Sequence, residues 1–259
     1  MKKEIVHMIL FAAMLSFAGC KEDVPTVFAE QDGIYFSATS DSVSYTFAKY
    51  PGRTKDTLKL PVTVLGMPSG TDRTITVEKG TASDANATEG VHYKLLGPYK
   101  MPANSVTTVV PVVIFRTPEM DSLTITFVLQ LKANESFQSG ISSKTSLKVK
   151  VGYLQKPSTW GEFAGTQWAG YSANFGTWTK TKYKVILDAL YDPVSDTTVT
   201  EFPYTRFSAP AIYIQYQQLV KNYIRTNYPG NYSTPEGIGA TLRDPDANNA
   251  VIKVGPANY

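Results

Sequence analysis

The chain has 259 residues with 25 Lys or Arg against 22 Asp or Glu, a formal net charge of +3. Because these charges are balanced and scattered along the chain, a nucleic-acid-binding protein is not expected. The single cysteine, Cys20, excludes an internal disulfide, so packing must stabilise the fold.

The N-terminus has the layout of a secretory signal peptide. Two lysines precede an almost wholly apolar run, residues 8–17, and two small residues follow it directly before Cys20. The run is too short to cross a bilayer, which takes about 20 apolar residues. The alternative is a buried helix of a globular domain. We predict that residues 1–19 are a signal peptide.

Cys20 gives this leader a more specific meaning. The segment Phe17-Ala18-Gly19-Cys20 resembles the lipobox of bacterial lipoproteins, although Phe17 replaces the usual Leu or Val. The resemblance implies cleavage before Cys20 and attachment of acyl chains, such as palmitate, to its sulfur and new amino group. Two or more such chains hold a protein firmly on a membrane. The alternative is an ordinary free thiol.

The charged residues after Cys20 add a location. Lys21, Glu22 and Asp23 resemble the signal that sends Bacteroidota lipoproteins to the outer face of the outer membrane. A solvated linker would have the same composition. The resemblance predicts a lipid-anchored, extracellular protein in which residues 20–32 form a tether.

The next part of the chain predicts an antiparallel, immunoglobulin-like β-sandwich over residues 33–155. Seven runs there alternate apolar with polar residues or are rich in β-branched residues, and turn residues separate them. Pro61 and Pro111 fall inside two of these runs and predict sheet edges or bulges. The seven runs are Gly33–Ala38, Ser42–Phe47, Asp56–Leu65, Arg73–Lys79, Val106–Phe115, Ser122–Leu131 and Thr145–Val151.

Residues 81–115 resemble the Calx-beta sandwich. The match rests on Ala87, Gly90, Val91, His92 and Tyr93. His92 stands where that family usually has Asp, so a calcium site is not expected, because Ca²⁺ takes six to eight oxygen ligands. Tyr93 is expected to pack in the core and to cap a loop with its hydroxyl.

A broader resemblance covers roughly residues 30–225. The leader, the opening "DGIYFSAT" and the stretch "LKLPVTVLGMPSGTDRTITVEKGTASDANATEGVHYKL" resemble a family of Bacteroidota outer-membrane lipoproteins of unknown function. Members are encoded beside SusC/SusD-like nutrient importers. The resemblance implies a partnership with such a transporter pair and leaves the ligand open.

Residues 156–259 predict a smaller α+β domain. A strand is expected over Lys182–Ala189 and another over Ala250–Val254, and an amphipathic helix near 212–227. The apolar stripe of that helix is formed by Ile212, Tyr216, Leu219, Val220, Tyr223 and Ile224.

Catalytic chemistry is sparse. Without the leader, His92 is the only histidine, so neither a zinc site nor a catalytic triad is expected. Acidic residues gather at 188–201 and could serve a glycosidase, yet "YDPVSDTT" favours a polar hairpin turn. They are Asp188, Asp192, Asp196 and Glu201. We expect no cofactor, no metal and no enzymatic activity.

An aromatic cluster between residues 160 and 178 is the candidate binding surface. It contains every tryptophan of the chain, with glycines interleaved. Such rings can meet sugar faces, peptide side chains or a partner protein, and they can equally fill the core of the second domain. The candidates are Trp160, Phe163, Trp168, Tyr171, Phe175 and Trp178.

These features together predict a non-catalytic surface lipoprotein. We expect it to assist a SusC/SusD-like importer by capturing or positioning an oligosaccharide or a peptide. The alternatives are a stand-alone structural or adhesive module of the cell surface and a hydrolase that acts through carboxylates.

Overall fold

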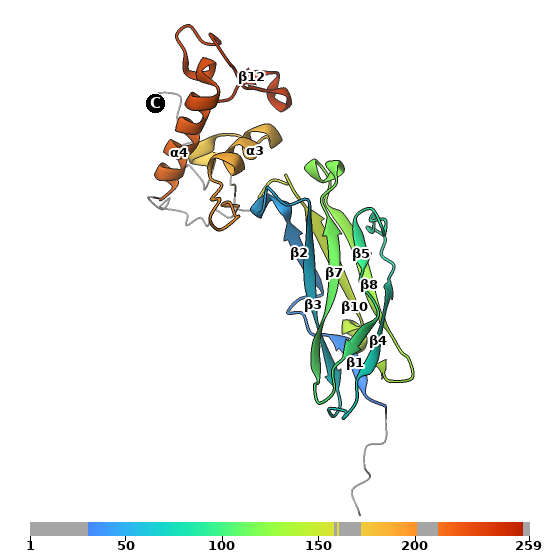
Figure 1. The fold of residues 1–259 in the computed structure, drawn as a ribbon. Coiled ribbons are helices and arrows are strands. Elements are labelled where there is room, and N and C mark those ends of the chain that lie inside the picture. Colours follow the sequence, from blue (N-terminus) through green and yellow to red (C-terminus); the bar gives the residue numbers. More distant parts are fainter. Residues whose placement is uncertain (1–30, 158–159, 161–171, 201–211, 256–259) are drawn as a thin grey trace, which may run out of the picture. The chain divides into compact units, whose positions relative to one another are not determined.

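The computed structural model describes residues 31–157, 160, 172–200 and 212–255 (Figure 1). Cys20, the export signal and the predicted leader lie outside these residues. Asp32–Tyr259 form one compact unit. None of the described helices has both the length and the hydropathy to span a membrane.

Two five-stranded sheets form a sandwich, which confirms the predicted mainly β fold (Figure 1). The first sheet has the order β5-β7-β3-β1-β9 and the second has the order β2-β10-β8-β4-β6. The pairs β1–β9 and β2–β10 are parallel, and the other pairs are antiparallel. The strands are β1 (Gly33–Phe36), β2 (Ser42–Thr46), β3 (Lys55–Leu65), β4 (Arg73–Lys79), β5 (Tyr93–Leu95), β6 (Tyr99–Met101), β7 (Thr107–Phe115), β8 (Ile125–Lys132), β9 (Gln138–Ser139) and β10 (Ser146–Gly152).

The core lies between the sheets because alternate residues of each strand share one face. Every second residue is buried in the second halves of β3 and β7 and through most of β10, and Tyr93 stacks on Phe127 with ring centroids 4.1 Å apart. The buried residues of β3, β7, β8 and β10 include Leu60, Val62, Val64, Val110, Val112, Ile114, Phe127, Leu129, Leu131, Leu147, Val149 and Val151.

The prediction that Pro61 and Pro111 mark sheet edges or bulges is wrong. They lie in β3 and β7, which pair without interruption in the interior of the first sheet. The Pro61 carbonyl accepts a hydrogen bond from the Ser37 N–H, just past the end of β1. Leu95, the last residue of β5, pairs with Val112, so Pro111 lies one position past the end of β5. The Pro111 carbonyl accepts a hydrogen bond from the Tyr99 hydroxyl of β6. Each missing N–H therefore falls where the neighbouring strand has ended.

Strand register defines the two ends of the sandwich. Gly33, the first residue of β1, pairs with Leu65, the last residue of β3. The chain therefore enters beside the β3–β4 loop, at what we call the tether end. Lys55 pairs with Phe115 at the opposite, far end. There β10 leaves the sandwich, and the 3₁₀ turn Pro118–Asp121 leads towards β8.

Helices follow the sandwich. They are α2 (Ser172–Phe175), α3 (Lys180–Ala189) and α4 (Ile212–Asn227), and a small hairpin pairs β11 (Arg243–Asp244) with β12 (Ala250–Val251). The predicted strand over Lys182–Ala189 is wrong, because α3 occupies it. The Thr179 hydroxyl caps this helix by accepting a hydrogen bond from the Lys182 N–H at 3.2 Å.

Helix α4 covers the predicted range, and its buried face overlaps the predicted apolar stripe in part. Within that stripe Val220 and Ile224 are buried, whereas Ile212 is 40% exposed and Leu219 is 52% exposed. Gln217 and Lys221 are buried instead, beside Val220. Apolar residues lie on more than one side of this helix, so the sequence pattern left its orientation underdetermined.

Candidate functional site

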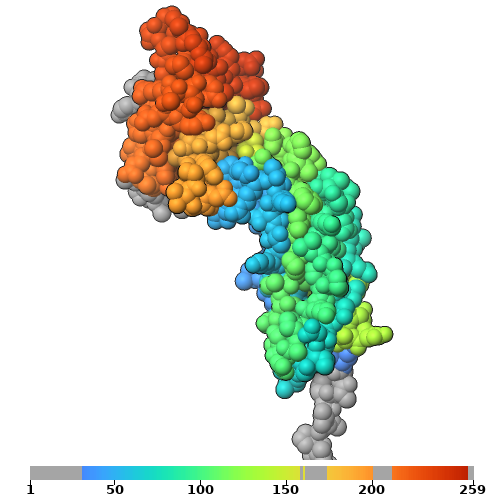
Figure 2. Space-filling model, in the orientation of Figure 1, coloured from blue at the N-terminus to red at the C-terminus, as the bar shows by residue number. Residues whose placement is uncertain are grey.

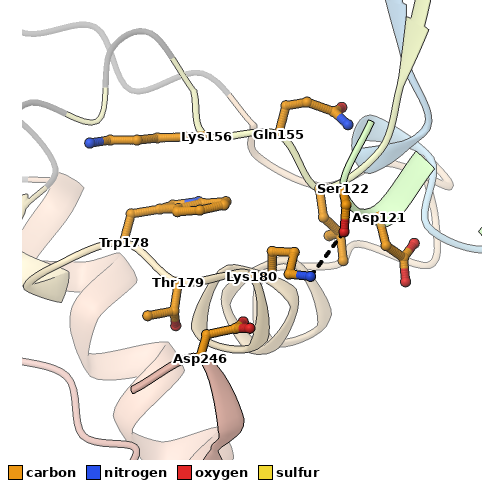
Figure 3. A pocket seen from close by; sticks show the side chains of 9 residues that line it. Asp121, Ser122, Gln155, Lys156, Trp178, Thr179, Lys180 and Asp246 are labelled. Carbon is orange, nitrogen blue, oxygen red and sulfur yellow. Dashed lines mark hydrogen bonds between the residues drawn. The ribbon is translucent and has the colours of Figure 1, made fainter. Parts of the chain in front are cut away.

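A cavity of about 480 Å³ opens at the far end of the sandwich (Figure 3). Its walls come from the turn before β8, the segment after β10, the residues that begin α3, and the hairpin near the C-terminus. The lining residues are Asp121, Ser122, Leu154, Gln155, Lys156, Trp178, Thr179, Lys180 and Asp246.

Trp178 supplies the aromatic wall. It directly precedes the helix cap Thr179, whose hydroxyl donates to the buried Asp244 carboxylate at 2.5 Å. The Trp178 side chain is half-buried, and its enclosed Nε1 has no hydrogen-bond partner among the described residues. Trp178 therefore presents its ring face, rather than its N–H, to the cavity. Figure 3 shows the flat indole with the Lys156 side chain extended above it.

Gln155 is held in place on the opposite wall. Its Nε2 donates to the backbone carbonyls of Met120 at 2.8 Å and Leu123 at 3.0 Å. Gly152 has no side chain where a Cβ would meet the Gln155 amide oxygen. This wall is therefore positioned before any ligand arrives, which reduces the ordering cost of binding.

The rim mixes donors and acceptors. Lys180 Nζ donates to Ser122 Oγ at 3.0 Å, while the carboxylates of Asp121 and Asp246 are exposed. A neighbouring cavity of about 240 Å³ shares Asp121, Leu154, Lys180 and Asp246 and extends to Lys184. A flat apolar ring surrounded by both kinds of polar group suits a ligand with one apolar face and many hydroxyls.

The aromatic candidates divide into core and surface. Trp160 is fully buried, meets Tyr183 edge to face at 6.0 Å, and donates its indole N–H to the Gly176 carbonyl at 3.0 Å. Phe175 is 1% exposed. These two rings belong to the core, the alternative that the sequence left open, and Trp178 lines the cavity. Phe163, Trp168 and Tyr171 lie outside the described residues.

His92 has a structural position. It is 7% exposed, its Nδ1 accepts the Thr88 N–H at 2.8 Å, and its Nε2 therefore donates to Glu119 Oε1 at 2.7 Å. The hydrogen bond from His92 holds the pKa of the Glu119 carboxyl below its usual value. Both ring nitrogens are thus occupied in fixing a loop. Among the described residues, no three His, Cys, Asp or Glu side chains gather as metal ligands.

The expectation for the Tyr93 hydroxyl is wrong in one respect. The ring is fully buried as expected, but its hydroxyl has no partner among the described residues. Loop capping falls to Tyr99, whose hydroxyl accepts from the Leu96 N–H at 2.7 Å and donates to the Pro111 carbonyl at 3.2 Å. The sequence therefore pointed to the wrong tyrosine.

The acidic residues near 188–201 have structural partners. Asp188 pairs with Lys184 at 2.7 Å, and Asp196 pairs with Arg53 at 3.0 Å, which holds the pKa of Asp196 below its usual value. Asp192 exchanges backbone hydrogen bonds across the turn, so the predicted hairpin turn is confirmed. Glu201 lies outside the described residues.

Residues 28–191 match the family described as "Domain of unknown function (DUF4843)". The chain belongs to this family. No curated protein matches the sequence.

Solved structures with a detectable likeness to this DUF4843 protein include three from Bacteroides. A two-domain protein of unknown function from B. fragilis is 13% identical over 53% of this chain and 52% of its own, with a TM-score of 0.37. A protein of unknown function from B. ovatus is 17% identical over 55% and 48%, with a TM-score of 0.37. An auxiliary nutrient binding protein from B. thetaiotaomicron is 11% identical over 64% and 56%, with a TM-score of 0.32.

The match thus covers about half the length of each of these proteins. Likenesses at these TM-scores carry no argument about ligand or activity. The Calx-beta resemblance and the link to a SusC/SusD pair stay predictions.

Proposed function

We propose that this DUF4843 protein is a lipid-anchored accessory protein on the outer face of the outer membrane. It binds an oligosaccharide in the Trp178 cavity and presents it to a SusC/SusD-like transporter pair, without cleaving it. The observation that carries the proposal is the indole face of Trp178 within a cavity rimmed by both hydrogen-bond donors and acceptors.

The cavity chemistry favours a sugar over a peptide. The C–H face of a sugar ring packs on an indole, and its hydroxyls both donate and accept, as the rim requires. Lys156 and Lys180 supply donors, and Asp121 and Asp246 supply acceptors. The volume of about 480 Å³ falls in the range of small-ligand sites, roughly 300–1,000 Å³.

The sandwich supports this role by separating the two ends. The proposed lipid attachment at Cys20 precedes the tether end, and the sandwich residues of the cavity lie at the far end. Strand β3 has 11 residues and at about 3.3 Å per residue spans roughly 36 Å. The sandwich therefore acts as a spacer that holds the cavity away from the bilayer.

Binding is tested by calorimetry of the full chain against parallel panels of oligosaccharides and peptides. We expect a sugar to bind and Trp178→Ala to weaken it at least about tenfold, or roughly 1.4 kcal/mol. Tyr191→Ala removes an exposed aromatic side chain outside the cavity and should leave the affinity unchanged. Binding of peptides alone, or of sugars to the Trp178→Ala variant as to the native chain, would overturn the assignment.

Attachment and partnership have separate tests. Intact-mass analysis of native material should show a chain that begins at an acylated Cys20. Detergent extraction should co-purify the transporter pair, and a lipoprotein recovered alone would instead favour the structural or adhesive alternative. Release of shortened sugar from the same panel would show that the protein is a hydrolase.

A further inference from the structure

The β3–β4 loop at the tether end exposes two large apolar side chains. Met67 is 77% exposed and Leu65, the last residue of β3, is 58% exposed. Figure 2 shows this loop, in cyan, at the surface of the tether end. Single exposed apolar residues are common on proteins, but these two are neighbours at the point where the chain enters the fold.

The point of chain entry is fixed against this loop. Asp32, the residue before β1, forms an ion pair with Arg73 at 2.5 Å, and its carbonyl accepts the Gln138 N–H at 3.0 Å. The Arg73 guanidinium also lies 4.5 Å from the centre of the Phe137 ring. Gly66, with φ of +154°, leaves the space that the Asp32 side chain fills. Residue 32 therefore has one position, directly beside Leu65 and Met67.

The loop itself is held in shape. The Ser69 carbonyl accepts the Asn104 N–H at 2.7 Å, and Asp72 accepts the Ala103 N–H at 3.0 Å. Asp72 also faces Lys100 at 3.7 Å. Asp72 and Asp32, on either side of the loop, therefore each lie opposite a base. Bringing a surface with paired charges against lipid costs less desolvation free energy than bringing one with unpaired carboxylates.

Chain length limits how far this end can move from an attached lipid. Cys20 and Asp32 are 12 residues apart, a reach of at most about 40 Å when fully extended. A flexible chain of this length has a typical span nearer 20 Å. Acyl chains at Cys20 would therefore keep the loop close to the bilayer at a high effective concentration.

We propose that Leu65 and Met67 dock this end of the sandwich on the lipid surface, at the boundary between headgroups and acyl chains. This rests on the lipid attachment in the proposed function. The lipid at Cys20 supplies the affinity, and the two side chains set the orientation, so that the far end with its cavity faces outward.

The test uses the full lipidated chain in phospholipid vesicles. Acylation consumes the only native thiol, so Met67→Cys creates a single site for an environment-sensitive fluorophore. Val194→Cys is the matched control, since Val194 is also an apolar loop residue, 95% exposed, in the turn tied to the far end by the Asp196–Arg53 pair. We expect nitroxide-labelled lipids to quench the dye at position 67 several-fold more than at 194, and aqueous iodide to do the reverse.

The outcomes distinguish a failure of the docking surface from a failure of the lipid anchor. A chain that fails to float with vesicles refutes the lipid anchor. A chain that floats while both dyes respond equally to iodide refutes the docking surface alone. Protection of position 67 in native membranes but not in pure lipid would assign the loop to a protein partner and overturn the lipid assignment. A Leu65→Ser variant labelled at 67 should lose most of the protection if the two side chains act together.

Discussion

Replacing Tyr93 with Phe should stabilise the protein. The Tyr93 hydroxyl is fully enclosed and has no hydrogen-bond partner among the described residues. Burial raises the pKa of this phenol, as expected for a hydroxyl removed from water. An unpaired buried hydroxyl costs about 1–3 kcal/mol. The substitution removes that cost and keeps the ring that stacks on Phe127 at 4.1 Å.

The magnitude follows from two opposing terms. The void left by one oxygen atom lowers the free energy of unfolding by only a few tenths of a kcal/mol, at about 24 cal/mol per Å³ of cavity. The free energy of unfolding should therefore rise by about 1–2 kcal/mol. Urea unfolding of the full chain measures it, and the change should appear in the midpoint with the slope unchanged.

Tyr99 provides the matched control. It is also buried, but its hydroxyl accepts the Leu96 N–H and donates to the Pro111 carbonyl. Tyr99→Phe strands a backbone donor and should lower the free energy of unfolding by about 1–2 kcal/mol. If Tyr93→Phe is destabilised as Tyr99→Phe is, the Tyr93 hydroxyl has a partner and the reasoning fails.

Two further predictions concern a tight contact and an ion pair. In Gly140→Ala, the new Cβ would lie 2.8 Å from the Ile34 carbonyl oxygen, so the free energy of unfolding, measured by urea unfolding, should fall by about 1–3 kcal/mol. A Cβ at Gly70 would have nothing within 4 Å, so Gly70→Ala should change the free energy of unfolding by no more than about 0.5 kcal/mol. The pKa of Asp196 is held below its usual 3.8, chiefly by Arg53, so its contribution is present above that pH and is lost as the pH falls through the lowered value. Thermal unfolding across this acid range should decline more steeply for the native chain than for Asp196→Asn, and parallel curves would count against the pair.

Much of the sandwich could be predicted because β3, β7 and β10 alternate buried with less buried residues. All seven predicted runs contain strands, and β3 buries Leu60, Val62 and Val64 as the pattern indicates. The short strands β5, β6 and β9 have two or three residues each and carry no such pattern. They exist because tertiary contacts bring their backbone beside β7, β4 and β1.

Helix α3 was mistaken for a strand because two signals conflicted. The β-branched pair Val185-Ile186 and the nearby Tyr183 favour strand. Tyr183, Ile186, Leu187 and Leu190 nevertheless recur at helical spacing, and all four are buried. Recognising Thr179 as the cap of a helix would have decided in favour of the helix.

The cavity could be only partly anticipated. Trp178 belonged to the aromatic cluster seen in the sequence, but Asp121, Gln155 and Asp246 carried no local signal. They meet because the turn before β8, the end of β10 and the C-terminal hairpin converge in space. Such a convergence of distant segments leaves no trace in sequence spacing.

The brevity of the outermost strands matters for a protein proposed to be crowded on a surface. The edges are β5, β9, β2 and β6, with three, two, five and three residues. Copies confined to one membrane plane collide constantly, and long open edges would let their backbones join into ribbons. Edges this short offer too few main-chain partners for such growth, so neighbouring copies can remain separate at high density.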